Sequence, residues 1–472
     1  MKTILMSEKD VKQKVNHKGM RLLALVLVML MLFSVTACAP KGEKPPAPSE
    51  SKKSDVKNDQ PDKPNKKTPD VNQDDVLKKI LLAAPGTKLD SVQYDDISAS
   101  CRAALWGFAD KTSRLALGDD ADKNALYSPI SLYYPLAMLE AGSAGTTREG
   151  LRDLLCLSDQ DISAELRKLY SLMTKEDKDS IEQIANSAWL SNNYKDDLRQ
   201  EWLDQLSNDY YASAFAVDFT DPVTSEQMNA WVKKATRDKI DPKFEPDYFD
   251  PLVMFVLINT LYYKASWRTS FDEKLNTEDT FHTPTGDVKV TFMNGGSGDA
   301  MHVEGDRWRA AQLNLTSGFV RFVLPDSGVT PEMLLEDETF LQDLRNSAWQ
   351  SCELAITVPK FTYRSSINLL EALEPISVIP LLQRGPDFSG LLKEESLANP
   401  YVSKIAQQTF IAFEEGGIEA AAMTLVEVSD ECAMMPIEIK LDRPFIYVIE
   451  DDAGAPLFVG IVRNPQTLRS LE

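Results

Sequence analysis

The sequence predicts an α+β fold in which helices from the first half of the chain pack on large mixed or antiparallel β-sheets. Segments with the 3.6-residue spacing of apolar side chains dominate from Ser98 to Arg237, whereas apolar runs of strand length dominate from Leu252 onward. Helices followed by strands are typical of α+β folds, since α/β folds alternate the two. The hydrophobic fraction of 43% over 472 residues is ordinary for a globular protein and provides for a sizeable core.

The N-terminal residues 1–38 resemble a bacterial lipoprotein signal peptide. A basic region precedes the apolar run Leu22–Phe33, which is shorter than the about 20 residues that cross a membrane, and the run leads to Ala37-Cys38. This resemblance implies lipidation of Cys38 and a chain held at the outer surface of a bacterial membrane. An ordinary signal peptide and an uncleaved anchor remain alternatives, and Met20 is an alternative start.

Residues 39–90 are predicted to be a disordered spacer, and residues 91–472 a single domain. The first part of this spacer is rich in Pro, Lys, Asp, Asn and Ser and has no aromatic residue up to about residue 75, so it buries too little apolar surface to offset the entropy of ordering. A weak helical pattern at Val76–Ala84 fits either the spacer or the domain.

Helical segments are predicted where apolar residues recur at helical spacing. The segment Ile130–Ala141 is apolar on all sides, which predicts deep burial, and Gly142 ends it. A further helix begins near Thr146. The other predicted helices are Ser98–Leu117, Asp161–Met173, Asp196–Asn208 and Thr224–Arg237.

Strands are predicted where apolar residues alternate or form short continuous runs. These segments are Leu252–Tyr263, Val288–Met293, Trp308–Leu315, Phe319–Leu324, Glu353–Tyr363, Ile405–Phe413, Ile437–Leu441 and Phe445–Ile449.

The composition excludes several classes of function. A net charge of −21 argues against nucleic acid as a partner, because phosphate binding needs clustered Lys and Arg. The cysteines that follow Cys38 are scattered without a CxxC spacing, so we expect neither a metal site nor a disulfide framework. These cysteines are Cys101, Cys156, Cys352 and Cys432. No cofactor is expected.

No catalytic motif is present in the sequence. The only histidines are His17, His282 and His302, and there is no HExxH, GxSxG, Walker or GxGxxG pattern. We therefore expect a protein that is not an enzyme.

The stretch Glu414–Pro436 lies between predicted strands and has two interpretations. Its Glu, Ala, Met and Leu residues favour a short helix. Its glycines, the lack of proline before Pro436 and the alternation in Leu425–Val428 favour an exposed loop that can become a strand.

Several blocks, in order from about residue 95 to 470, resemble the serpins, a family of serine protease inhibitors. Any one block is weakly specific, but the ordered set is strongly so. The blocks are Asn124–Ser131 with Ala137–Thr147, Asn229–Val232 with Lys239-Ile240, Leu257–Trp267 with Met293-Asn294, Val358–Phe361, Asp387–Gly390 and Glu414–Thr424.

The resemblance implies a serpin fold with an exposed reactive-centre loop. It also implies an irreversible suicide-substrate inhibitor of extracellular serine proteases, or of cysteine proteases, which traps the acyl-enzyme when the loop inserts into the main sheet. The alternative is a non-inhibitory serpin that acts as a binding or carrier protein. We expect a monomer.

The resemblance places the hinge of this loop at residues 415–424. With a strand period of two, Ile418, Ala420, Ala422 and Thr424 share one uncharged face, which is what burial in a sheet requires. Ile418 stands where the family usually has Thr or Ser, and two glycines stand where one is usual. The hinge residues are Glu415, Gly416, Gly417, Ile418, Glu419, Ala420, Ala421, Ala422 and Thr424.

The resemblance also implies a polar network that controls opening of the main sheet, made of Ser128, Ser131, Asn259 and Gln407. Gln407 occupies the position of a family histidine. A glutamine still donates and accepts hydrogen bonds, but it brings no pH dependence.

Counting from the hinge places the bond that a protease would cleave at Glu431-Cys432. Counting back from Pro444-Phe445 favours Ala433-Met434, and Cys432-Ala433 lies between them. The first bond implies an acid-preferring target protease, whereas the other two imply elastase-like or subtilisin-like targets.

Overall fold

The structure, a computed structural model, describes residues 73–466 except 119, 121–122, 159–160, 243, 246–248, 250–252, 397, 403 and 420–435. The described residues belong to one compact unit, Pro69–Glu472. The predicted signal peptide with Cys38, the hinge residues from Ala420 onward and the four candidate residues of the cleaved bond, Glu431–Met434, lie outside the described residues.

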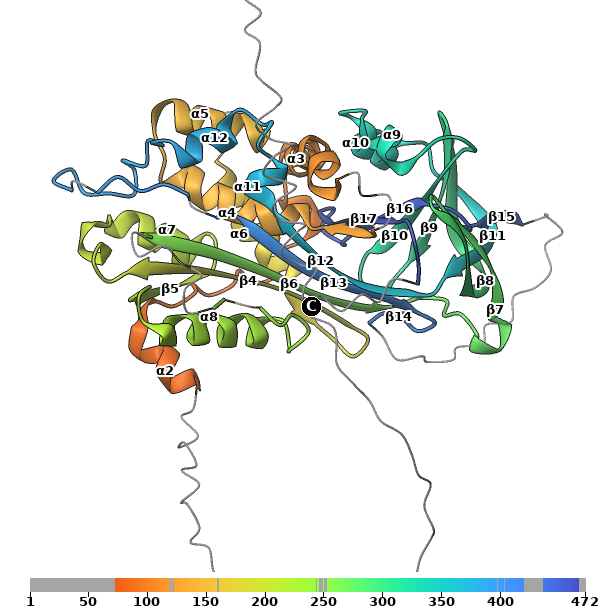
Figure 1. Ribbon diagram of the computed structural model, residues 1–472, viewed down its shortest axis with the longest axis horizontal. Helices are drawn as coiled ribbons and strands as arrows, with labels where there is room; N and C mark the ends of the chain where they lie inside the picture. The colour runs from red at the N-terminus through yellow and green to blue at the C-terminus, as the bar shows by residue number, and fades with distance from the viewer. Residues whose placement is uncertain are drawn as a thin grey trace, which may run out of the picture. The chain divides into compact units, whose positions relative to one another are not determined.

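Two mixed β-sheets dominate this unit, as the α+β prediction requires (Figure 1). Most neighbours run antiparallel, while β4–β5 and β11–β15 run parallel. The first sheet has the order β1 (Leu81–Ala83), β5 (Ala212–Val217), β4 (Ser180–Ser191), β6 (Phe255–Ser266), β14 (Gly417–Ile418), β13 (Ala406–Glu414) and β12 (Phe361–Asn368), with β3 (Lys175–Glu176) paired to β4. The second sheet has the order β15 (Ile437–Lys440), β11 (Gln350–Pro359), β8 (Gly286–Gly305), β9 (Trp308–Asn314), β10 (Phe319–Pro325), β16 (Phe445–Glu450), β17 (Pro456–Val462) and β2 (Ala125–Tyr127), with β7 (Thr277–Thr283) paired to β8.

Helices cover both faces of the first sheet. Figure 1 shows α3 to α6 with α11 and α12 on one face, and α8 with α2 on the opposite face. The helices are α2 (Gln73–Ile80), α3 (Ala99–Leu117), α4 (Pro129–Ala141), α5 (Gly145–Leu154), α6 (Ile162–Met173), α7 (Gln200–Asn208), α8 (Pro222–Ala235), α9 (Pro331–Leu335), α10 (Phe340–Asn346), α11 (Leu369–Ala372) and α12 (Val378–Gln383).

Helix α4 is the buried helix that the sequence predicts. Pro129 occupies its first turn, where a missing N–H costs nothing, and Gly142 caps its C-terminal end. Almost all of its side chains are buried, so its surface is apolar on every side. It packs behind β6 and β17, in the main core of the unit.

A smaller core lies between the first sheet and α8. Trp189 and Phe215 stack at a centroid distance of 4.5 Å and pack with Met228 and Trp231 of α8. Leu77 and Ile80 of α2 cover the same cluster. Helix α8 is therefore held on the sheet by apolar contacts that do not involve the main core.

Residues 73–83 are folded, although the sequence analysis places them in the spacer. Helix α2 contacts α8, and Leu81 pairs with Phe215 in β5. The physical reason is that Leu77, Ile80 and Leu81 pack against the buried apolar cluster between the first sheet and α8, and composition alone does not reveal that cluster.

Two predicted elements differ from the structure. The segment Glu353–Tyr363 is two strands in different sheets, because the chain crosses from the second sheet to the first at Lys360, whose N–H donates to the Thr291 carbonyl. The start of the segment Asp196–Asn208 is a short 3-10 turn, and the α-helix begins only at Gln200. Among the described residues, no helix is long and apolar enough to cross a membrane.

Candidate functional site

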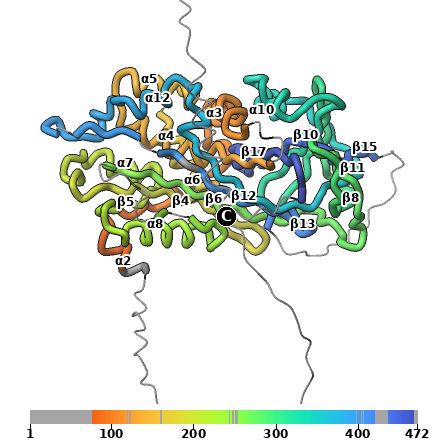
Figure 2. The backbone as a smooth tube through the Cα atoms, viewed as in Figure 1, coloured from red at the N-terminus to blue at the C-terminus, as the bar shows by residue number. Residues whose placement is uncertain are grey.

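The first sheet contains a slot between β6 and β13. In the part of the sheet that the structure describes, these two strands are joined only through the two residues of β14. Gly417 pairs with Ser266 on one side and with Glu414 on the other, and Ile418 pairs with Ala265 and Phe413. Figure 2 shows β6 and β13 running side by side along the sheet. The hinge therefore already enters the sheet at one end.

The turn before β14 is held firmly at this end of the slot. The Trp267 indole N–H donates to the Glu414 carbonyl at 2.9 Å, and the Trp267 and Phe271 backbone N–H groups donate to the carbonyls of Gly416 and Glu415 at 3.0 Å each. These bonds fix where the chain reverses. The entry of the hinge is thus anchored to the end of β6 and the turn beyond it.

Gly417 is a position where a side chain does not fit. Its φ is +147°, and a Cβ there would lie 2.2 Å from the Ala265 carbonyl oxygen. Only glycine lets the backbone approach β6 this closely. Ile418 follows with its side chain fully buried in the main core.

Glu415 is buried beside the slot and has defined partners. Its carboxylate accepts hydrogen bonds from Lys360 Nζ at 2.8 Å and from Asn276 Nδ2 at 2.7 Å. Burial opposes the charged form, but the hydrogen bonds from Lys360 and Asn276 outweigh it and lower the pKa of Glu415. The pair connects the hinge to the crossing between β11 and β12.

Glu419, the last described hinge residue, points away from Ile418. Its φ is +51°, which is uncommon for a residue with a side chain, so its backbone has left the strand conformation. Its carboxylate is buried, and Oε2 forms an ion pair with Lys239 Nζ at 3.3 Å. The geometry of this contact is not that of a hydrogen bond, so Oε2 has no hydrogen-bond partner. Burial raises the pKa of Glu419 despite Lys239.

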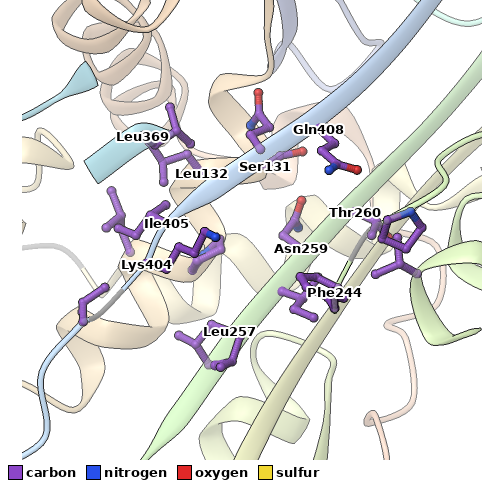
Figure 3. A pocket seen from close by; sticks show the side chains of 18 of the residues that line it. Ser131, Leu132, Phe244, Leu257, Asn259, Thr260, Leu369, Lys404, Ile405 and Gln408 are labelled. Atoms are coloured by element: carbon purple, nitrogen blue, oxygen red, sulfur yellow. The ribbon is translucent and has the colours of Figure 1, made fainter. Parts of the chain in front are cut away.

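Below β14 the slot opens into a cavity of about 500 Å³. Residues 255–261 of β6 form one wall, and α4 closes the inner side. The other wall is formed by Lys404 and Ile405, just before β13, and by residues 407–409 at its start. Figure 3 shows Leu257, Asn259 and Thr260 on the β6 side, with Ser131, Leu132 and Ile405 across from them. Val232 of α8, together with Ile240 and Phe244 after it, closes the outer side.

The predicted polar network is only partly assembled. The Gln407 side chain accepts from the Ser128 backbone N–H at 2.7 Å and donates to the Ser128 carbonyl at 2.9 Å, and the Ser128 hydroxyl donates to Ser131 at 3.0 Å. These contacts join β13 to the N-terminus of α4, across one wall of the cavity. All three residues thus lie close together.

Asn259 lies on the opposite wall and bonds to another residue. Its Nδ2 donates to Asn186 Oδ1 at 2.7 Å, and Asn186 in turn donates to the Tyr210 carbonyl at 2.6 Å. The Asn259 Oδ1 is buried without a hydrogen-bond partner, although its residue lines the cavity. The slot thus separates Asn259 from Gln407.

Sequence reasoning missed three residues of this site: Asn186, Asn276 and Lys360. Asn186 lies in β4, a strand with many polar residues and therefore without the clear alternation of apolar residues by which a strand is predicted. Lys360 belongs to the block Val358–Phe361, which does provide a signal, but its partner Glu415 lies 55 residues away in sequence.

The two histidines among the described residues, His282 and His302, lie in strands β7 and β8 of the second sheet, away from the slot. His282 Nδ1 contacts Asp287 at 2.8 Å in an exposed hairpin, where no hydroxyl or thiol is positioned by it. Within the described ranges, no group of three or more His, Cys, Asp or Glu residues could hold a metal ion.

Comparison with known proteins identifies the architecture. A family model described as "Serpin (serine protease inhibitor)" matches residues 106–465. The chain is 28% identical to mouse alpha-1-antitrypsin 1-4 over 399 residues, which cover 82% of this chain and 94% of that protein.

Solved structures agree. The native-state crystal structure of tengpin, a thermophilic serpin, superposes with a TM-score of 0.70 at 26% identity and covers 82% of this chain and 98% of tengpin. Human thyroxine-binding globulin, solved in complex with thyroxine, superposes with a TM-score of 0.66 at 23% identity, over 78% of this chain and all of that chain, which shows a shared fold.

Proposed function

Because the chain belongs to the serpin family of serine protease inhibitors, we propose that it inhibits proteases as a suicide substrate by inserting its cleaved loop between β6 and β13. Membership of an inhibitor family also means that the protein is not an enzyme. Serpin loop insertion is an established example of strand addition to a sheet. The features of this chain that support it are argued below.

The main support for this proposal is the strand register of β14 with β6 and β13 at the mouth of the slot. Because β14 is antiparallel to both neighbours, each further residue of the loop moves one residue down both walls. Continued insertion then places Thr424 between Gln407 and Asn259. The same register places residues 422–428 against residues 255–261 of β6, and residues 422–426 against residues 405–409 on the other wall of the cavity. The cavity in the sheet thus corresponds to residues 422–428 of the loop.

The side chains of this length of loop suit the slot. Ile418 faces the main core, so the residues at even positions after it face the same way. These are Ala420, Ala422, Thr424, Val426 and Val428, all small or β-branched and uncharged. Such residues fit between α4 and the sheet without burying a charge.

Insertion also satisfies backbone groups that face the slot. About ten ladder hydrogen bonds at ~1 kcal/mol net each supply on the order of 10 kcal/mol before side-chain packing. A target serine first forms an ester with the carbonyl of the residue before the cut, and the new amino terminus leaves. The energy released on insertion then moves the attached protease before the ester is hydrolysed.

We place the cleaved bond at Glu431-Cys432, with Cys432-Ala433 and Ala433-Met434 as the neighbouring alternatives. The first bond suits an acid-preferring protease, and the other two suit elastase-like or subtilisin-like enzymes with small apolar pockets. We also propose that oxidation of the Cys432 thiol would change the side chain that the protease recognises.

Incubation of the purified protein with elastase, subtilisin and a glutamyl endopeptidase tests the proposal. We expect a denaturant-stable adduct with at least one enzyme, and mass spectrometry of the released C-terminal peptide then identifies the bond. Digestion of the loop by all three enzymes without an adduct would overturn the inhibitory mechanism and favour a non-inhibitory binding or carrier serpin.

A matched pair of variants tests insertion itself. Ala420→Arg places a charge on the core-facing side of the inserted strand, so we expect normal cleavage but loss of the adduct. Ala421→Arg places the same side chain on the opposite side, and we expect it to retain more adduct. Equal trapping by both variants would contradict insertion in this register.

We also propose that the chain is a lipoprotein held at the outer surface of a bacterial membrane through Cys38. The basic region, the apolar run Leu22–Phe33 and the Ala37-Cys38 junction support this location. Cys38→Ala should release the protein from membranes and abolish labelling by a radioactive fatty acid. Persistent labelling of that variant would refute the proposal.

A further inference from the structure

Two buried carboxyl groups lie beneath the mouth of the slot, outside the hinge and the polar network. Glu182 of β4 pairs with Tyr263 of β6. Two residues earlier, Ser180 pairs with Ala265, which in turn pairs with Ile418 of the hinge. Glu182 therefore lies close to the point where the loop enters the sheet. Asp451 lies in the turn between β16 and β17, next to Asp452. The Ser317 hydroxyl lies 3.5 Å from a carboxylate oxygen of Glu182 and 3.4 Å from one of Asp452, so this turn lies beside Glu182.

Both groups are almost fully buried and only half satisfied. Glu182 is 1% exposed; one of its oxygens accepts from the Ser317 hydroxyl at 3.5 Å, while Oε1 has no hydrogen-bond partner. Asp451 is also 1% exposed; Oδ1 accepts from the Ala455 N–H at 2.7 Å, while Oδ2 has no partner. A buried carboxylate oxygen without a donor is costly, and a shared proton removes that cost.

The surrounding charges do not neutralise this pair. Lys175 of β3 reaches the cluster but forms its ion pair with Asp452 at 2.6 Å, and Asp452 also accepts from Gly318 at 2.9 Å. Glu450 pairs with Arg321 at 2.6 Å and Arg345 at 3.3 Å. The remaining polar neighbour is Tyr263, whose hydroxyl donates to the Ser317 carbonyl. Lys175 thus acts on three carboxyl groups, Glu182, Asp451 and Asp452, with a single positive charge.

The electrostatics favour a retained proton. Burial raises the pKa of both Glu182 and Asp451 above its ordinary value. Repulsion from the Asp451 carboxylate raises the pKa of Glu182 further. Two carboxyl groups in such an environment ionise one after the other, so the pair holds a proton that exposed acids have already lost.

We propose that Glu182 and Asp451 share one proton and form a pH-responsive latch that holds β4 against the β16–β17 turn. At pH values where the proton is present, one acid donates to the other, and the contact between the two sheets is closed. When the proton is lost, two carboxylates face each other in a buried site and the latch loosens. The proposal concerns the folded inhibitor itself and does not depend on which protease it traps.

The direction of the pH effect follows from the raised pKa values. The unfolded chain loses these protons near pH 4, whereas the folded chain keeps one of them to a higher pH. Stability from this proton is therefore complete below the unfolded pKa and declines as pH rises through the folded pKa. While the folded state holds one proton that the unfolded state lacks, the folding equilibrium constant falls about tenfold per pH unit.

Urea unfolding of the full chain between pH 6.5 and 8 tests the latch with Glu182→Gln and Asp451→Asn. An amide keeps the shape and the hydrogen-bond donor of the protonated acid. We therefore expect the stability of both variants to fall less with rising pH than that of the wild type. At pH 8 both variants should be more stable than the wild type. Glu140→Gln is the matched control, because Glu140 is a buried carboxylate that pairs with Arg148 and Arg152. Glu140→Gln should lower the free energy of unfolding and leave its decline between pH 6.5 and 8 unchanged.

Hydrogen exchange provides a readout that does not require unfolding. After correction for the intrinsic rate, amides of β3 and β4 should exchange faster at pH 8 than at pH 6.5 in the wild type, and equally at both in Glu182→Gln. The proposal is overturned if the wild type shows neither the decline in stability nor the faster exchange at higher pH. It is also overturned if Glu182→Gln shows these pH effects undiminished.

Discussion

At the residue scale, Gln407 shows how a substitution within a family pattern can keep a contact and change its chemistry. The resemblance to serpins implies a histidine at this position, but the glutamine bonds to both the N–H and the carbonyl of Ser128. A glutamine does not titrate, so opening of the sheet at this point gains no pH dependence from it. Any pH dependence of this protein must come from other groups.

Gln407→Ala should destabilise the intact protein by about 2 kcal/mol, because it leaves the buried N–H and carbonyl of Ser128 without partners. Ser131→Ala, which removes only one bond between hydroxyls, should cost about 1 kcal/mol or less. Urea unfolding measures both. A cost for Gln407→Ala no larger than that for Ser131→Ala would show that the Gln407 contact is unimportant.

Glu415→Gln should cost about 1 kcal/mol near neutral pH, since Lys360 is partly exposed and solvent weakens the pair. The pKa of Glu415 is lowered in the folded state, so its contribution is present above the unfolded pKa and is lost as pH falls through the folded pKa. The stabilities of variant and wild type should therefore converge in acid. A constant difference down to pH 3 would contradict the ionic role of Glu415.

Some of the candidate residues from recognisable blocks lie together in the structure, while their roles stay predictions. Ser128, Ser131 and Gln407 do come together, and Glu415 to Ile418 do lie at the mouth of the slot. The sequence did not predict that Asn259 turns to Asn186, because that pairing depends on the register between two strands distant in sequence.

At the element scale, the main difficulty was recognising strands that carry polar residues. Strand β4 has the sequence SIEQIANSAWLS, and most of its polar positions are buried, under helices that include α4, α6 and α8. Such burial is a tertiary effect that a local pattern does not contain. The strands with continuous apolar runs, such as β10 and β16, were predicted nearly to their ends.

Thr424→Val tests the register of the inserted strand. In that register Thr424 reaches Asn259, and its hydroxyl would donate to the Asn259 Oδ1, which has no partner in the present structure. Valine has the same shape without the hydroxyl donor. The cleaved protein should therefore lose about 1 to 3 kcal/mol of stability, while the stability of the intact protein is unchanged. Thermal unfolding of both forms measures this, with Thr424→Ser as the control that restores the donor. Equal losses in the intact and cleaved forms would argue against this position.

At the scale of the whole molecule, the fold is organised around an incomplete sheet. The eight-stranded sheet is interrupted between β6 and β13, with α4 behind the gap and α8 in front of it. Composition and element order predicted the α+β class. The gap itself is seen only when both walls are placed, because it is a stretch where, among the described residues, the two regular strands β6 and β13 do not pair with each other.

Hydrogen exchange of β6 and β13 before and after cleavage of the loop tests the central claim most directly. We predict that amides of residues 255–264 and 406–412 that face the slot exchange readily in the intact protein and become strongly protected once a protease has cut within residues 431–434. We also predict that residues 420–428 become protected with them. If the walls keep their original exchange rates after cleavage, and the cut loop exchanges like a free peptide, the loop does not enter the slot and the proposed mechanism is wrong.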